Sequence, residues 1–472
     1  MQIIEPPTNM TGAGMQARDK PNLAYVARVA LVASTGGFLF GYDMALMAGA
    51  LPFLEREFAL TPALAGWAVS SAILGGIAGP LLGLWFTDGI GRRRTMMLAA
   101  FIFMASTIGC ALAGSIHAFA LWRFVGGMGV GLAMISSPIY IAELAPPAVR
   151  GSLVNVNQLS NVIGINLAVA VAYLFSGYDE NWRLMLGSQA IPVLCLMLGL
   201  LLVPESPRWL ASKGRTDEAM KVLTRINGPT VARQELEAIN ADVGSDTGRF
   251  SELWEPSSRM ALKLGIILMI FSQINGVNML LLYAPTIMTE AGVSFGSNAI
   301  LSSVPIYLLI LICTLFAFPL IHRFSRRGLL IASAGGIAVG HVLMAVILGL
   351  HLPAMLLLIP MMIGTGAFTV GLAPLSWVIV SEIFPNRIRG KALAVVCVFL
   401  FGASFLTAQF FPIVVDWFKR TTGSSAGIYL FFAVICISCV WFAWRRLPET
   451  KGLSLEEIGA FWRARQNSDR HL

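Results

Sequence analysis

Long apolar windows recur along the chain and are separated by short polar segments. About 20 consecutive apolar residues of helix are needed to cross a bilayer core of about 30 Å, and twelve such windows can be counted. We expect the spans to be residues 25–50, 64–87, 95–114, 118–140, 153–176, 182–203, 262–288, 297–320, 328–350, 353–381, 391–415 and 426–446. Each should be helical, because lipid cannot satisfy the open edge of a strand.

The composition supports a membrane location. Of 472 residues, 56% are hydrophobic and only 12% are charged, which is far more apolar than an ordinary soluble domain. The first 22 residues lack the basic and then apolar order of a secretory signal, so no cleaved leader is expected. All six cysteines fall within expected spans, without the spacing of a disulfide framework or a zinc site. We therefore expect no metal, and no catalytic constellation is visible in the spans.

The basic residues predict the orientation of the spans. Connections such as "GRRRT" (91–95), "APPAVRG" (145–151) and "FPNRIRGK" (384–391) are basic, whereas the alternate connections are poor in Lys and Arg, apart from "DWFKR" (416–420). The positive-inside rule then places both chain ends in the cytoplasm and the spans in the plasma (inner) membrane. The net charge of +8 is explained by basic residues on the cytoplasmic side, next to anionic lipid headgroups. Nucleic-acid binding is therefore not expected, and the sequence implies no obligate protein partner.

The hydropathy pattern divides the chain into two halves of six spans. We expect five segments: a cytoplasmic N-terminal segment (1–24), a first half (25–204), a cytoplasmic helical linker (205–261), a second half (262–447) and a cytoplasmic tail (448–472). Short motifs recur between the halves: "DGIGRRR" (88–94) with "HRFSRRG" (322–328), "IAELAPPAVRGSL" (141–153) with "VSEIFPNRIRGKAL" (380–393), and, weakly, "PESPRWL" (204–210) with "PETKGLSLEEI" (448–458). A duplicated six-helix unit favours a carrier whose halves rock around a midplane site over a channel.

Glycines spaced by four predict close helix packing. Such spacing is found at Gly37 and Gly41, at Gly75, Gly79 and Gly83, and at Gly127 and Gly131. The "GGMGVG" of 126–131 could be taken for a nucleotide-binding loop, but it follows no strand and lies inside an expected span, so packing is favoured. The chain carries no Walker A sequence, and ATP coupling within it is unsupported.

Eight motifs in a fixed order resemble those of the sugar porter family of the major facilitator superfamily. They are "GGFLFGYD" (36–43), D-x-x-G-R-R (88–93), "RFVGGMGVG" (123–131), "YIAELAP" (140–146), "PESPRWL" (204–210), Q-x-x-G-x-N (273–278), "SEIFPNRIRGKALA" (381–394) and "PETKG" (448–452). The resemblance covers nearly the whole chain. It implies an all-α major facilitator fold of twelve transmembrane helices in two pseudo-symmetric halves. It also implies symport of a monosaccharide (hexose or pentose), with the proton as coupling ion and no cofactor.

Asp43 and Arg123 are the clearest charges deep in the first half. A charge at mid-span costs about 2.5 to 3.5 kcal/mol even on the lenient insertion scale, and such groups usually mark ion pathways. An acid and a base attract strongly at low dielectric, so the two should pair. One interpretation is a static pair that pins two helices. In the interpretation we favour, Asp43 accepts the proton and Arg123 tunes it, being released when Asp43 is protonated. By resemblance, facilitative relatives should carry a neutral residue here.

Amide side chains in the fifth span provide candidate sugar ligands. Those within about half the circumference of the predicted helix are Asn155, Asn157, Gln158, Asn161 and Asn166. A buried sugar hydroxyl left without a partner costs about 1 to 3 kcal/mol, so such amides suit a sugar ring. Gln158 is central and matches the family's sugar ligand, and Asn161 is a second candidate. The alternative for any single Asn is hydrogen bonding between helices.

The seventh and tenth spans add further candidate ligands. Ser272, Gln273, Asn275 and Asn278 lie in the seventh span, and Trp377 in the tenth offers a stacking surface or ordinary packing. For Gln273 and Asn278 to touch one sugar, the helix must be irregular near Gly276.

The predicted pocket departs from the family at several positions. Where relatives carry hydrogen-bonding or otherwise conserved groups, this chain has Ile165, Ser272, Leu282-Tyr283, Ala373-Pro374, Leu400 and Phe401. The pocket has thus lost several hydrogen-bonding groups, and a deoxysugar, a less hydroxylated polyol or another small solute stays open. A facilitative uniporter and a non-transporting sugar sensor are the rival functions.

Charged motif residues at cytoplasmic span ends predict a gate. They are Asp88, Arg92, Arg93, Glu143, Arg150, Glu205, Arg208, Glu382 and Arg389. We expect Glu143 to pair with Arg150, Glu382 with Arg389, and both arginines at 92–93 to lie beside Asp88. Exposed pairs contribute only about 0 to 1 kcal/mol each, but a set broken on opening can bias a two-state equilibrium. His322 stands where the motif has Asp, as a solvated or a pH-sensitive group, and His341 should be hydrogen-bonded in the bundle.

Overall fold

The computed structural model describes residues 21–243, 250–290, 292, 297–384, 386–447 and 449. Every element in this part of the chain is a helix, and no strand occurs in it. Twelve stretches of it are long and apolar enough to cross a membrane. The prediction of an all-α membrane protein with twelve spans is confirmed.

The first half consists of seven helices that form six spans. They are α1 (Leu23–Glu57), α2 (Pro62–Ile90), α3 (Arg92–Ala111), α4 (Ile116–Leu144), α5 (Arg150–Phe175), α6 (Asn181–Gly187) and α7 (Ala190–Leu202). The side chains of Asn22, Thr61 and Ser115 accept backbone N–H groups at the starts of α1, α2 and α4, which satisfies donors that a helix leaves unbonded. The sixth span, expected as one helix, is interrupted between α6 and α7.

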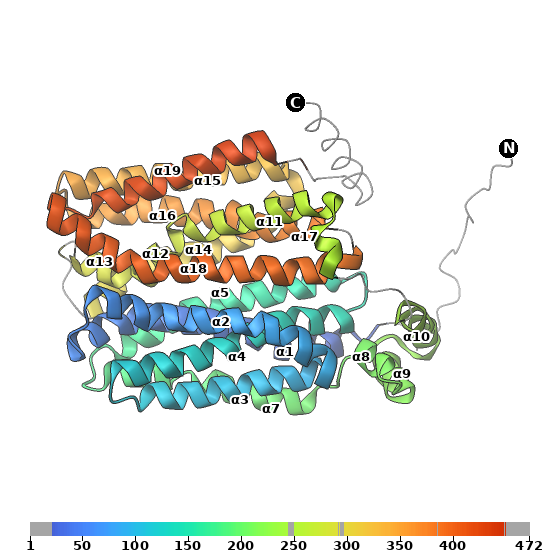
Figure 1. Cartoon of the computed structure of the whole chain (residues 1–472). Helices are drawn as coiled ribbons and strands as arrows, with labels where there is room; N and C mark the ends of the chain where they lie inside the picture. The colour runs from blue at the N-terminus through green and yellow to red at the C-terminus, as the bar shows by residue number, and fades with distance from the viewer. Residues whose placement is uncertain are drawn as a thin grey trace.

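Three short helices after α7 form a small domain of their own. They are α8 (Pro207–Ser212), α9 (Thr216–Asn227) and α10 (Pro229–Val243), and the short 3₁₀ helix η2 (Phe250–Trp254) follows. Trp209, Leu223 and Leu236 belong to a separate apolar cluster that holds α8–α10 together. The three helices lie at one end of the bundle (Figure 1), which we call the linker end.

The second half has two broken spans. Its helices are α11 (Pro256–Ile274), α12 (Val277–Leu282), α13 (Ala284–Glu290), α14 (Ser297–Arg323), α15 (Arg326–Gly349), η3 (Ala354–Leu357), α16 (Leu358–Ala367), the π-helix η4 (Phe368–Leu372), α17 (Ala373–Ile383), α18 (Asn386–Thr422) and α19 (Ala426–Arg446). The seventh span breaks between α11 and α12, where Gly276 takes a φ of +89°. Glycine adopts this left-handed conformation without the steric cost that a Cβ would bring. The irregularity expected near Gly276 is therefore present.

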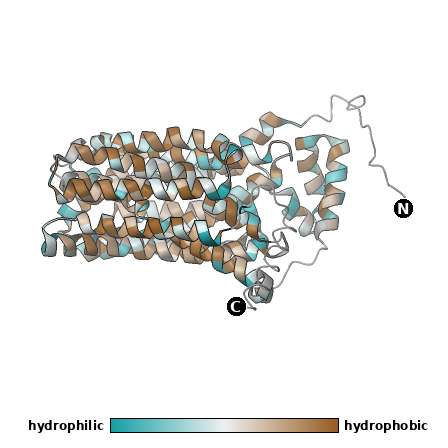
Figure 2. Ribbon diagram, turned by 90° about the horizontal axis from the view of Figure 1, so that it is seen from above, coloured by the Kyte–Doolittle hydropathy of each residue, from teal (hydrophilic) through white to brown (hydrophobic). Residues whose placement is uncertain are grey.

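The two halves lie side by side (Figure 1), with α2 packed along α18 and α5 along α14. Brown, hydrophobic residues run along the length of the bundle, and teal, hydrophilic ones gather toward the linker end (Figure 2). Large apolar side chains are exposed on the flanks, including Trp85 (82% exposed) and Leu202 (85%). Such surfaces suit contact with lipid rather than water.

Glycines bring α2 and α4 into backbone contact. A Cβ added at Gly127 would lie 1.9 Å from the carbonyl oxygen of Ala72, and one at Gly75 would lie 2.0 Å from that of Phe124. Glycine 41 allows the same approach between α1 and α5, where an added Cβ would lie 2.1 Å from the carbonyl oxygen of Asn161. The predicted packing role is confirmed for Gly41, Gly75 and Gly127, whereas Gly83 makes only an ordinary contact at 3.6 Å with Ile135. The "GGMGVG" run is part of a transmembrane helix interface.

Candidate functional site

Asp43 and Arg123 form a buried ion pair between α1 and α4. Each residue is only 6% exposed, and the Arg123 guanidinium donates to the Asp43 carboxylate. The expected proximity of these two charges is present. Because each charge is removed from water, the loss of either would leave the other without compensation.

A third side chain, which the sequence analysis missed, completes this cluster. The Gln189 amide nitrogen donates to Asp43 Oδ1 at 2.9 Å, and Gln189 is 3% exposed. It lies at the interruption between α6 and α7, in the run "GSQAIP" (187–192). An amide between Gly187 and Pro192, in a span whose other polar residues are Arg183 and Ser188, was the available signal. Asp43 therefore accepts hydrogen bonds from two donors, Arg123 and Gln189.

The amides of α5 divide into two groups. Asn157 accepts from Ser137 at 3.0 Å, Asn161 donates to the Gly37 carbonyl at 3.2 Å, and Asn166 donates to the Tyr307 carbonyl at 3.1 Å. These three join α5 to α4, α1 and α14. Gln158, in contrast, is exposed. An exposed amide in mid-span suits a water-filled cavity better than lipid.

The break between α11 and α12 brings two candidate ligands together. Asn278 Nδ2 donates to Gln273 Oε1 at 2.8 Å, and both side chains are partly buried. Five positions of regular helix would separate these side chains by about 140° around the axis. The contact between them therefore depends on the break.

Ser272 and Asn275, which were expected as ligands, are buried and make hydrogen bonds to the backbone beside the break. Ser272 is 3% exposed and donates to the Met269 carbonyl at 2.7 Å. The Asn275 side chain, 1% exposed, donates to the Ser272 carbonyl at 2.6 Å and accepts from the N–H of Val277 at 3.0 Å. These side chains bond to backbone groups beside the break, because the break leaves backbone donors and acceptors that need hydrogen-bond partners.

The indole of the tenth span is partly accessible. Trp377 lies on α17, just after the π-helix η4, and is 37% exposed. The apolar departures Leu400 and Phe401 on α18 are 5% and 7% exposed, and the Phe401 ring packs against Gly76 of α2. Phe401 therefore contributes to packing between the halves, and Leu400 is buried in an apolar cluster made mainly by the second half.

Charged residues at the linker end pair differently from the prediction. Arg92 pairs with Glu143 at 2.9 Å and with Asp88 at 3.1 Å, and Ser206 donates to the same Glu143. The expected partner Arg150 has its Nε buried without a hydrogen-bond partner among the described residues. The expected Glu143–Arg150 pair is therefore wrong. The arginine that starts α3 lies beside the end of α4, whereas Arg150 begins α5 after an intervening turn.

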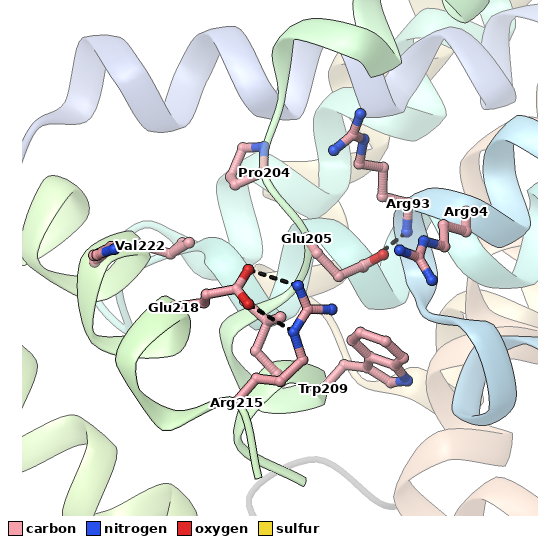
Figure 3. A pocket seen from close by; sticks show the side chains of 10 residues that line it. Arg93, Arg94, Pro204, Glu205, Trp209, Arg215, Glu218 and Val222 are labelled. Atoms are coloured by element: carbon pink, nitrogen blue, oxygen red, sulfur yellow. Dashed lines mark hydrogen bonds and ion pairs between the residues drawn. The ribbon is translucent and has the colours of Figure 1, made fainter. Parts of the chain in front are cut away.

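Glu205 caps the start of α3. Its Oε1 accepts the backbone N–H groups of Arg93 and Ser206, both at 2.9 Å, so an acid lies at the positive end of a helix dipole. Figure 3 shows Glu205 pointing toward Arg93 beside a cavity of about 430 Å³ that Arg94 and Arg215 also line. This capping ties the segment after α7 to the first half. Arg208 is exposed on α8.

The second half repeats this arrangement. Glu449, which the sequence analysis did not select, accepts the backbone N–H groups of Arg326 and Arg327 at 3.0 and 3.3 Å. The Arg326 side chain pairs with Glu382 at 3.4 Å, and Arg389 instead donates to the Phe384 carbonyl at 3.3 Å. The expected Glu382–Arg389 pair is therefore wrong too. The weak repeat of "PES" in "PET" was the signal for Glu449. The His322 side chain lies outside the described part.

Hydrogen bonds join the halves at the end opposite the linker. Ser70 of α2 donates to Gln409 Oε1 of α18 at 2.7 Å, and Gln409 Nε2 donates to the Ala63 carbonyl at 3.0 Å. The Asn166–Tyr307 bond between α5 and α14 belongs to the same end. The two halves are thus in close contact at this end of the molecule.

Two six-helix halves with polar groups held at mid-span define a membrane carrier of the major facilitator type. A family model described as "Sugar (and other) transporter" matches residues 29–462. The arabinose-proton symporter of Bacillus subtilis is 37% identical over 451 residues, which cover 93% of this chain and 96% of that protein. The D-xylose-proton symporter of Escherichia coli is 34% identical over 478 residues, with the same coverage. The chain therefore belongs to the sugar transporter family, whose members are transporters rather than enzymes.

Solved structures of the E. coli xylose transporter XylE have the same fold. Its inward open conformation superimposes with a TM-score of 0.82 at 32% identity, covering 93% of this chain and 100% of that one. Its complex with 6-bromo-6-deoxy-D-glucose gives a TM-score of 0.76 at 33% identity and the same coverage.

Proposed function

We propose that this protein couples proton entry to the uptake of a monosaccharide, by alternating access in the plasma membrane. The observation that carries the proposal is the buried Asp43–Arg123 pair with its third member, Gln189. One proton that crosses 100 mV and one pH unit releases about 2.3 plus about 1.4 kcal/mol. That energy supports an accumulation of several hundred-fold, whereas a uniporter only equilibrates its solute.

Protonation of Asp43 is the step that moves the carrier. The ionised carboxylate accepts from Arg123 on α4 and from Gln189 between α6 and α7, so it holds three spans together. A proton on Asp43 cancels the attraction to Arg123. Removing one partner of a buried pair costs about 3 to 5 kcal/mol, because the remaining charge stays out of water. The carrier relieves this cost by adopting a conformation in which Arg123 is hydrated.

The solute binds between the halves, to side chains at mid-span that are exposed or partly buried. Gln158 of α5, the Gln273–Asn278 pair and Trp377 of α17 offer amide donors and acceptors and one aromatic face, the groups that a sugar ring requires. Pentoses are the first candidates, because the relatives are named for arabinose and xylose. Asn161 supports this site from the contact between α5 and α1.

The linker end faces the cytoplasm in this proposal, with both chain ends on that side. The arginines of α3 and α15 lie there, as the positive-inside rule requires. The Gln409 contacts then close the outer end, which is consistent with the likeness to the inward open conformation of XylE. We also propose that the chain is organised in five segments, residues 1–24, 25–204, 205–261, 262–447 and 448–472.

Transport into proteoliposomes tests the proposal. Labelled sugars and polyols are offered with and without an imposed pH gradient to wild type, to Asp43→Asn and to Asp416→Asn. Asp416 is an acid on α18 that pairs with Arg420 at 2.9 Å at the helix surface, so its variant is the matched control. We expect the gradient to drive accumulation by wild type and Asp416→Asn, and Asp43→Asn to equilibrate the solute only.

The outcomes separate the rival functions. Accumulation by Asp43→Asn equal to that by wild type would refute its coupling role. Equilibration without accumulation by wild type would identify a uniporter. Binding without flux would identify a sensor, and a panel with no solute taken up or bound would refute the substrate class.

A further inference from the structure

The break between α11 and α12 leaves a backbone acceptor outside the helical pattern. In a regular helix the carbonyl of Asn275 would accept from the N–H of Met279 four positions later. Here the N–H groups of Met279 and Leu280 both bond to the Gly276 carbonyl, at 3.0 and 3.1 Å. The buried Asn275 carbonyl therefore needs a donor from another element, because an unsatisfied buried polar group is costly.

His341 of α15 supplies that donor. Its Nε2 lies 2.7 Å from the Asn275 carbonyl oxygen, and His341 is 1% exposed. A carbonyl only accepts, so Nε2 carries the hydrogen. A second, weaker donor comes from α19, where Cys436 Sγ lies 3.6 Å from the same oxygen. One carbonyl at the break is thus held from two other helices.

The imidazole ring also fills the space that the break creates. A Cβ added at Gly276 would lie 3.0 Å from His341 Cε1 and 2.5 Å from the Phe432 ring. The His341 ring centroid lies 5.4 Å from that of Phe432 and 6.1 Å from that of Tyr429, within the range of aromatic pairs. The ring is therefore fixed by α19 on one side and by the break on the other.

We propose that His341, assisted by Cys436, is a positioning residue that holds the α11–α12 break in place through the Asn275 carbonyl. The break brings Gln273 Oε1 and Asn278 Nδ2 to 2.8 Å, so His341 sets the spacing and direction of these two amides. The proposal rests on the proposed function, in which the amide pair binds the solute. His341 controls the affinity for the solute and takes no part in proton coupling at Asp43.

Two variants of His341 and one of each of two cysteines separate positioning from general packing. His341→Phe keeps an aromatic ring but removes the donor, and His341→Gln keeps an N–H near the position of Nε2. Cys436→Ala removes the weaker donor. Its matched control is Cys439→Ala, since Cys439 is similarly buried one turn further along α19 and, within the described part of the chain, makes no hydrogen bond to the Asn275 carbonyl.

Two measurements on purified carrier are made for each variant. Hydrogen exchange of the backbone amides in residues 275–283 reports the break without any solute. The half-saturation concentration of the solute that wild type takes up best reports the affinity of the binding site, and it is measured together with the maximal rate of solute transport. In His341→Phe we expect the backbone amide hydrogens of this segment to exchange about tenfold faster. The half-saturation concentration for the solute should rise at least about fivefold, while the maximal rate of transport stays within about twofold of the wild-type rate. His341→Gln should restore both, and Cys436→Ala should show a smaller change that Cys439→Ala lacks.

Several results would overturn the proposal. One is that His341→Phe keeps the wild-type rate of hydrogen exchange and the wild-type affinity for the solute. Another is that His341→Gln loses as much affinity as His341→Phe, and a third is that Cys436→Ala and Cys439→Ala give the same exchange rates and affinities. If the His341 variants fail to fold, the cysteine pair still decides. If wild type takes up no solute but the exchange pattern is as expected, the proposed function fails and the positioning role stands.

Discussion

Replacement of Gly127 by Ala should destabilise the protein by a predictable amount. The added Cβ would lie 1.9 Å from the carbonyl oxygen of Ala72, whereas an ordinary van der Waals contact begins at 3.4 Å. Helices α2 and α4 must therefore separate locally by about 1.5 Å, the difference between these two distances. Separation also disturbs the neighbouring Gly75 and Gly79 contacts, since these glycines pack on the backbone of the same helix.

The energetic terms oppose each other. Forcing extra atoms into a well-packed contact costs about 1 to 3 kcal/mol, while Ala in place of Gly gains up to about 1 kcal/mol of helix propensity. An approach of 1.9 Å to a backbone atom places the packing cost in the upper part of its range, at about 2 to 3 kcal/mol, so we expect a net loss of about 1 to 2 kcal/mol. A six-helix half is similar in size to domains in which 1 kcal/mol shifts the melting temperature by about 2 to 4 °C, so melting should fall by about 2 to 8 °C.

The assay is thermal melting of detergent-purified carrier, followed by size-exclusion chromatography, and the control is Gly83→Ala. A Cβ at Gly83 would meet Ile135 at 3.6 Å, an ordinary contact on the same face of α2. The control should melt at or slightly above the wild-type temperature. If Gly127→Ala and Gly83→Ala melt within about 1 °C of each other, the inferred backbone contact is wrong.

Three further variants test other parts of the molecule. Gln158→Ala should raise half-saturation for the solute several-fold, because a sugar hydroxyl loses a buried partner; an unchanged value would exclude it from the site. Gln409→Leu removes two hydrogen bonds between the halves, so the ratio of molecules with separated outer ends to molecules with closed outer ends should rise by about 5- to 150-fold. Spin-label distances between the outer ends of α2 and α18 measure this ratio, and a wild-type distance distribution would refute the contact. Glu143→Gln should lower the melting temperature, whereas Asp88→Asn should not, because the Glu143 side chain is 13% exposed and that of Asp88 is 76% exposed; equal melting would contradict this difference.

Local patterns along the chain were sufficient for the architecture. Hydrophobic windows long enough to cross a bilayer identified twelve spans, because each span must satisfy its own backbone and present apolar side chains to lipid. Glycine spacing predicted close helix packing, since residues four apart share a helix face, and the structure shows that α2 and α4 are the partners. The Asp43–Arg123 pair could be predicted from two isolated charges, because neither charge is tolerated alone at that depth.

The choice of partners was decided only by the tertiary structure. Arg92 rather than Arg150 meets Glu143, because the ends of helices α3 and α4 converge there. Gln189 reaches Asp43 from an interruption between α6 and α7 that hydropathy does not reveal. Hydropathy and periodicity describe each helix as straight and separate. Breaks, crossing points and helix ends determine which side chains meet. The Asn275 carbonyl accepts a hydrogen bond from His341, 66 positions later, only because the helix breaks after α11, next to α15.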